Sequence, residues 1–154
     1  MGTLRKSVNR SLEKILIFLM GILVLDVLWQ VFSRYIMSSP SSFTDEMAGF
    51  LLIWVGLLGA AYVSGRNEHL AIDLFIQKSN PNRQKWLHRL ISLLIIFFAV
   101  TVLIIGGSWL AYTRFALHVR SAALNLPLGY VYLVLPLSGF LILFFSVSDL
   151  LTQD

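Results

Sequence analysis

Residues 90–112 read LISLLIIFFAVTVLIIGGSWLAY and contain no charged side chain. A helix needs about 20 mostly apolar residues to cross the ~30 Å hydrocarbon core of a bilayer, so this stretch predicts a transmembrane helix. Similar apolar stretches lie at about 15–35, 45–64 and 128–147. We therefore expect an all-α integral membrane protein with four transmembrane helices.

The composition agrees with a membrane protein. Of the 154 residues, 57% are hydrophobic and only 13% are charged, with a mean hydropathy of +0.78. A soluble domain has about a quarter charged residues. The net charge of +4 does not point to nucleic acid, because the basic residues lie between apolar blocks. The absence of cysteine excludes disulfides and thiolate metal sites. We expect a single membrane domain, 1–154.

The first apolar stretch also resembles a signal peptide, because basic residues precede it. However, it is longer than the apolar region of a typical leader, and no small-residue cleavage site follows it. Asp26, Gln30 and Arg34 would also be unusual in a cleaved leader. We expect it to be retained as the first transmembrane helix.

The basic residues predict the orientation. Four precede the first stretch and five lie between the second and the third: Arg5, Lys6, Arg10, Lys14, Arg66, Lys78, Arg83, Lys85 and Arg89. The other three, Arg34, Arg114 and Arg120, lie in the remaining two loops. Since cytoplasmic loops carry the excess of Lys and Arg, both termini are expected in the cytoplasm.

The segment at about 67–77 predicts an amphipathic helix between the second and third transmembrane helices. His69, Asp73 and Gln77 are spaced by four residues, and most of the others are apolar. A helix with one thin polar stripe suits the membrane interface or a groove on a partner.

Asp26 lies near the middle of the first apolar stretch, with Gln30 and Arg34 one and two turns further along. A carboxylate at the bilayer centre costs roughly 2.5–3.5 kcal/mol on insertion scales, so it should be paired or protonated. One interpretation is a proton or cation site, and the other is a polar contact between helices.

The second stretch carries small residues at Gly49, Gly56, Ala60 and Ser64, widened by Gly59, Ala61 and Gly65. Such a stripe lets another helix approach closely. Trp54 lies on a different face and offers a large contact to lipid or a partner.

Further small residues and a proline are expected to shape the last two helices. Gly106 and Gly107 offer a close-packing patch on the third helix, and Pro136 should bend the fourth because it removes a backbone donor.

No catalytic or cofactor pattern is present in the sequence. His69, His88 and His118 lie outside the predicted membrane core or at its edge, so they do not supply the axial ligands that a haem inside a bundle needs. Their spacing does not fit a metal site, and no phosphate-binding glycine loop is present. We expect a protein that is not an enzyme and needs no cofactor.

Residues in a fixed order resemble one known family, the DctQ-like small membrane subunit of tripartite ATP-independent periplasmic (TRAP) transporters. The matching segments are Gln30-Val31-Phe32-Ser33-Arg34-Tyr35, Phe43-Thr44-Asp45-Glu46, Trp54, Gly59-Ala60-Ala61, His69-Leu70-Ala71-Ile72-Asp73, and Leu126-Pro127 ahead of Pro136. The resemblance extends over about 15–147, whereas Asp26 has no counterpart in the family pattern.

The resemblance implies a non-catalytic subunit of a sodium-coupled uptake system for organic acids, often a dicarboxylate or a sialic acid, in a bacterial inner membrane. Its partners would be a large multi-spanning membrane subunit, which holds the substrate and sodium sites, and a periplasmic substrate-binding protein. The small subunit would scaffold the former and help to dock the latter.

The resemblance also implies roles for individual residues. Arg34 and Glu46 would be polar anchors at the outer membrane edge, and Trp54 with Gly59, Ala60 and Ala61 would form helix contacts. His69 and Asp73 would belong to an ordered cytoplasmic helix.

Two alternatives stay open at this point. The chain could be a self-sufficient oligomeric transporter that uses Asp26 for coupling, or it could anchor a redox enzyme in the membrane.

Overall fold

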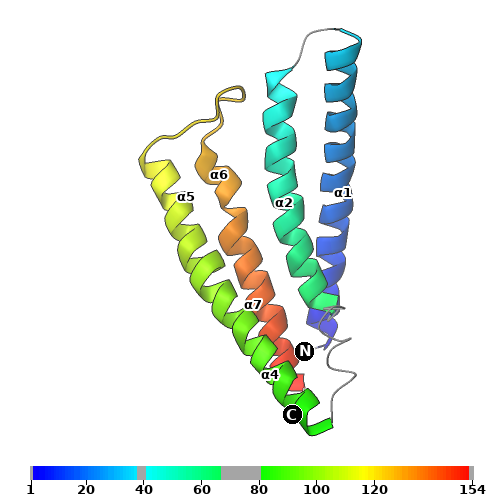
Figure 1. Cartoon of the computed structure of the whole chain (residues 1–154), viewed down its shortest axis with the longest axis vertical. Coiled ribbons are helices and arrows are strands. Elements are labelled where there is room, and N and C mark those ends of the chain that lie inside the picture. The colour runs from blue at the N-terminus through cyan, green and yellow to red at the C-terminus, as the bar shows by residue number, and fades with distance from the viewer. Residues whose placement is uncertain (1, 38–40, 67–80, 153–154) are drawn as a thin grey trace.

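The computed structural model describes residues 2–37, 41–66 and 81–152, and it is helical throughout apart from short connections (Figure 1). Within these residues, four helices are long and apolar enough to cross a membrane: Leu4–Tyr35, Ser42–Arg66, Arg89–Ala116 and Leu128–Leu150. The predicted all-α fold with four transmembrane helices is therefore confirmed. The predicted interfacial helix at 67–77 lies outside the described residues, and the predicted orientation stays a prediction.

Helix α1 (Gly2–Tyr35) begins well ahead of the apolar run at 15–35. At 1.5 Å per residue its 34 residues span about 51 Å, more than the ~30 Å of a hydrocarbon core. The four basic residues that precede the apolar run therefore lie on the same helix as that run. Leu, Lys, Arg and Glu are good helix formers, and they favour this extension.

The third membrane helix is continuous but not uniform. It consists of α4 (Pro81–Phe98), the π-helix η1 (Ala99–Gly106) and α5 (Gly107–Ala116). Within the π-helix, the hydroxyl of Thr101 donates a 2.7 Å hydrogen bond to the carbonyl of Phe97. The wide turn ends where the amide of Gly107 reaches the carbonyl of Val102, five residues back.

The last membrane helix is divided into α6 (Leu128–Tyr132) and α7 (Val134–Thr152) by a turn at Leu133. Pro136 explains the division, because it has no amide hydrogen to donate to the carbonyl of Tyr132. The sequence predicted a bend at this proline, and the structure interrupts the regular helix one turn before it.

The helices form two antiparallel pairs that meet along α2 and α7. One core cluster contains Leu12, Leu58, Val134 and Phe145, from α1, α2 and α7. A second contains Ala61, Ala99, Leu103 and Ile142, from α2, η1 and α7. In Figure 1 the pairs lie closer at the end that carries the start of α1 and the end of α7. We call this the terminal end, and the opposite end, with the start of α2 and loop 117–127, the loop end.

Glycines allow close approach within the second pair. A Cβ atom on Gly107 would lie 2.6 Å from Cβ of Leu135, and one on Gly129 would lie 2.5 Å from the ring of Phe115. Gly139 is similarly close to Leu103. The sequence predicted close packing at Gly106 and Gly107; Gly107 packs closely, whereas Gly106 is exposed.

Candidate functional site

The first turn of α2 is tied to loop 117–127 at the loop end. The carboxylate of Glu46 accepts a hydrogen bond of 2.8 Å from the amide of Ala122 and another of 3.0 Å from that of Leu124. Two amides of one turn that converge on a carboxylate resemble the anion-binding concavities made by turns. The sequence predicted a polar anchor at Glu46, and the structure identifies the loop as its partner.

The base of this loop is closed by its own hydrogen bonds. The amide of Ser121 donates to the carbonyl of Leu126 (2.9 Å), and the amide of Leu128 donates to that of Val119 (3.0 Å). Asn125 has a positive φ of 54°, a conformation that asparagine tolerates better than most residues. The loop is thus a compact turn and not an open connection.

Arg34 also lies at the loop end, where it pairs with Asp45 in the first turn of α2. The closest N–O distance is 3.8 Å, and both side chains are about half exposed, at 54% and 46%. Such an exposed pair contributes little to stability, so Glu46 is the stronger link.

A second polar cluster joins three helices at the terminal end. The guanidinium of Arg5 donates to the carbonyl of Gly65 from Nε (3.1 Å) and Nη2 (3.0 Å), and Nη1 pairs with Asp149. The same guanidinium lies 5.9 Å from the ring centre of Phe145. Arg5, Gly65 and Asp149 thus tie α1, α2 and α7 together.

This cluster was not predicted from the sequence, where Arg5 counts only as one of the basic residues that set the orientation. The signal was available in Asp149, a lone acidic residue at the end of an otherwise uncharged helix.

The three polar residues on one face of α1 differ in burial and in their partners. Asp26 is 8% exposed, and its Oδ2 atom has no hydrogen-bond partner among the described residues. Gln30 is half-buried, and Arg34 is exposed and paired with Asp45. Of the three side chains, only that of Asp26 is buried.

The predicted small-residue stripe of α2 faces away from the rest of the chain only in part, because Ala61, Ser64 and Gly65 are buried against the other helices. A Cβ atom built on Gly49, Gly56 or Gly59 would meet nothing within 4 Å, and Ala60 is exposed. The opposite side of the helix provides the internal contacts, including the fully buried Ala61. The part of the stripe formed by Gly49, Gly56 and Ala60 is therefore available to another helix.

Trp54 is partly buried and packs against the first core cluster. It contributes to packing within the chain.

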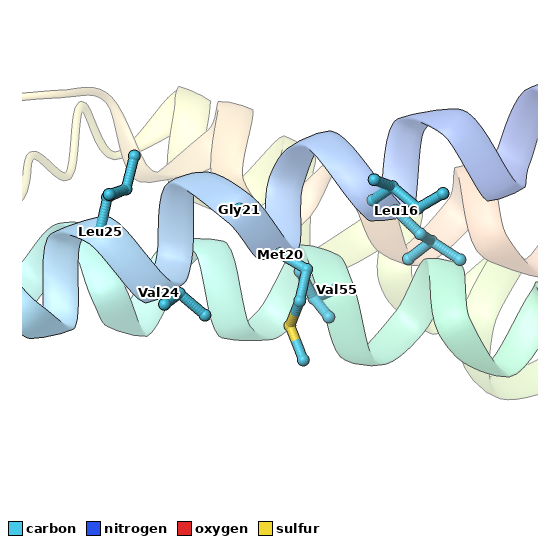
Figure 2. A pocket seen from close by; sticks show the side chains of 7 residues that line it. Leu16, Met20, Gly21, Val24, Leu25 and Val55 are labelled. Atoms are coloured by element: carbon cyan, nitrogen blue, oxygen red, sulfur yellow. The ribbon is translucent and has the colours of Figure 1, made fainter.

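An open apolar groove runs along α1 and α2 (Figure 2). It is lined by Leu16, Ile17, Met20, Gly21, Val24, Leu25 and Val55. Figure 2 shows Met20 beside Val55. The groove can accommodate hydrocarbon but offers no side chain for chemistry.

No group of three or more metal-ligating side chains occurs in the part of the chain that the structure describes. His69 and Asp73 lie outside that part. The described residues thus provide polar links between helices and apolar faces.

Comparison with known proteins gives a consistent result. The family profile of the DctQ component of tripartite ATP-independent periplasmic transporters matches residues 23–154. A Haemophilus influenzae protein with the provisional name TRAP transporter small permease protein is 27% identical over 99% of this chain and 92% of its own length.

Two proteins of Vibrio cholerae are also similar. The sialic acid TRAP transporter small permease protein SiaQ is 26% identical over 85% of this chain and 79% of its own length. The C4-dicarboxylate TRAP transporter small permease protein DctQ is 30% identical over 64% of this chain and 42% of its own length.

Proposed function

The chain belongs to the DctQ component family of TRAP transporters and is a small permease subunit, and on this premise we propose that it scaffolds the large membrane subunit without carrying solute itself. Small permease subunits of this family work in a tripartite complex with a large membrane subunit and a periplasmic binding protein. The observation that carries the scaffold role is the outward-facing stripe of Gly49, Gly56 and Ala60.

The stripe supports a helix contact for a physical reason. Lipid tails are as apolar as leucine, so helices in a bilayer associate through close packing, which small residues permit. The stripe continues into an apolar groove lined partly by Ala60, Val63 and Phe98. A transmembrane helix of the large subunit fits this face better than mobile lipid, because it would fill the space above each glycine.

We further propose that the loop end faces the periplasm and helps to dock the binding protein. The positive-inside rule places the basic terminal end in the cytoplasm of a bacterial inner-membrane protein. Loop 117–127 and the first turn of α2 would then be on the side where a periplasmic protein arrives.

Sodium coupling and substrate recognition are assigned to the large subunit in this proposal. The described residues provide no cluster of cation ligands. The names of the two Vibrio cholerae relatives refer to sialic acid and C4-dicarboxylates, so we propose an organic acid as the transported solute.

The scaffold role is tested by co-purification with the large subunit. Gly56→Leu should reduce the recovered large subunit severalfold, because it fills the open stripe. Gly106→Leu is the matched control, since Gly106 is also exposed on a membrane helix but lies on the other helix pair. Equal recovery with both variants would contradict the assigned face.

One observation favours a second candidate, a self-sufficient transporter coupled through Asp26. Its Oδ2 atom is buried without a partner among the described residues, and intramembrane carboxylates often mark ion or proton pathways. Solute uptake by liposomes that contain this chain alone would establish the second candidate and refute the scaffold proposal.

A further inference from the structure

The tip and the base of loop 117–127 are held by different parts of the chain. The base is closed by backbone hydrogen bonds within the loop, and the hydroxyl of Ser121 also accepts a 3.3 Å bond from the amide of Leu126. The tip amides of Ala122 and Leu124 instead donate to Glu46, which precedes them by 76 and 78 residues. The shape of the tip therefore depends on one side chain from another helix.

The loop presents side chains to the surroundings of the loop end. Leu117 is 67% exposed and Leu126 is 47% exposed, and the polar Arg120 and Asn125 are exposed between them. Both apolar and polar side chains of this compact turn are thus accessible to a protein that reaches the loop end.

The two acceptor oxygens of the Glu46 carboxylate match the two donor amides at the tip of the loop in number and in geometry. Each of its oxygens accepts one amide, so the two bonds together fix the position and the rotation of the turn. Glutamine at this position would keep one acceptor oxygen but would place an NH2 donor against the second amide. Alanine would remove both acceptors.

From this geometry we propose that Glu46 is a positioning residue that fixes the tip of loop 117–127 in the shape to which the periplasmic binding protein docks. The proposal rests on the proposed function. Holding a loop in its bound conformation removes part of the ordering cost of association. Loss of Glu46 should therefore weaken docking, while assembly with the large subunit and the later transport steps stay intact.

The test uses the complete complex reconstituted in liposomes, with uptake measured against the concentration of the binding protein. Glu46→Ala should raise the half-saturating concentration about three- to tenfold, the effect of one to two modest hydrogen bonds. Glu46→Gln should give a smaller rise, and the maximal rate should stay within about twofold of the wild type. Asp45→Asn is the matched control, because Asp45 is in the same helical turn but pairs only at 3.8 Å with the exposed Arg34.

A spectroscopic measurement reports on the loop itself. A nitroxide label on a cysteine introduced at Ala123 should become more mobile with Glu46→Ala and should stay unchanged with Asp45→Asn. If Glu46→Ala does not assemble, Glu46→Gln decides, because it keeps the side-chain volume.

The outcomes separate this inference from the function on which it rests. A wild-type complex that does not form or does not respond to the binding protein would refute the proposed function, whatever Glu46 does. A working wild-type complex would refute the positioning role if Glu46→Ala and Glu46→Gln left the half-saturating concentration unchanged. The positioning role would also be refuted if the label at position 123 were as immobile in Glu46→Ala and Glu46→Gln as in the wild type.

Discussion

Removal of the Arg5–Asp149 pair should separate the helices at the terminal end. Arg5 donates to the carbonyl of Gly65 and pairs with Asp149, so one side chain connects three helices. Near this cluster, a Cβ atom on Gly65 would lie 2.7 Å from Oδ1 of Asn9 and 3.0 Å from the ring of Phe145. Arg5 therefore acts where the backbones already pack closely.

The magnitude follows from the bonds and their exposure. A hydrogen bond to a charged group contributes about 1.5–3 kcal/mol when it is protected from water. The side chains of Arg5 and Asp149 are 18% and 17% exposed, which reduces this contribution by screening. We expect Arg5→Ala to lower the free energy of unfolding by about 2–3 kcal/mol and Asp149→Ala by about 1–2 kcal/mol.

The assay is a double-mutant cycle on the purified subunit in mixed micelles, unfolded with sodium dodecyl sulfate and followed by tryptophan fluorescence. The coupling energy between Arg5→Ala and Asp149→Ala should be about 1–2 kcal/mol, a factor of roughly 5 to 30 in the unfolding equilibrium. Lys6→Ala is the control, because Lys6 is exposed on the same turn of α1. A coupling below about 0.3 kcal/mol, within the error of such cycles, would refute the proposed contribution of the pair.

The remaining predictions concern packing and the buried carboxylate. Gly107→Ala should lower the unfolding free energy by about 1–3 kcal/mol, because its Cβ would meet Leu135. Gly56→Ala should leave the unfolding free energy unchanged, because there is open space around Gly56. Equal losses for both variants in the same unfolding assay would contradict this reasoning. Pro136→Ala should supply the missing amide donor and make the last helix more continuous. The measurement is hydrogen exchange, which should become slower near Leu133. Unchanged exchange would show that packing, and not the proline, divides the helix at Leu133. Asp26→Asn in the complete complex should preserve uptake, because the scaffold proposal gives Asp26 no coupling role; loss of sodium-dependent uptake with normal assembly would favour the alternative.

The sequence was sufficient to predict the four membrane helices, because the bilayer imposes a simple condition on length and polarity. Residues 90–112 meet that condition without a single charge. The start of α1 was harder to predict, because its first turns are polar and owe part of their stability to Arg5 and its distant partners. The π-helix at Ala99–Gly106 has no corresponding signal in hydrophobic periodicity.

In the candidate site, too, individual polar residues could be predicted from the sequence, whereas their partners far along the chain could not. The family resemblance implied that Arg34 and Glu46 are polar anchors at the outer membrane edge. Their partners could not be predicted, because the contact of Glu46 with Ala122 depends on how α2 and loop 117–127 are placed in the fold. The outward direction of Gly56 likewise became clear only once Ala61 was seen to occupy the internal side.

The π-helix also bears on how this subunit can change over evolution. A π turn holds more residues than an α turn, so deleting one residue within Ala99–Gly106 could restore regular α geometry and keep both flanking segments in register. Gly107 would still meet Pro136, and Ala99 would still lie inside the bundle. This segment is therefore a place inside the bilayer where descendants of the sequence can differ in length by one residue without losing the fold.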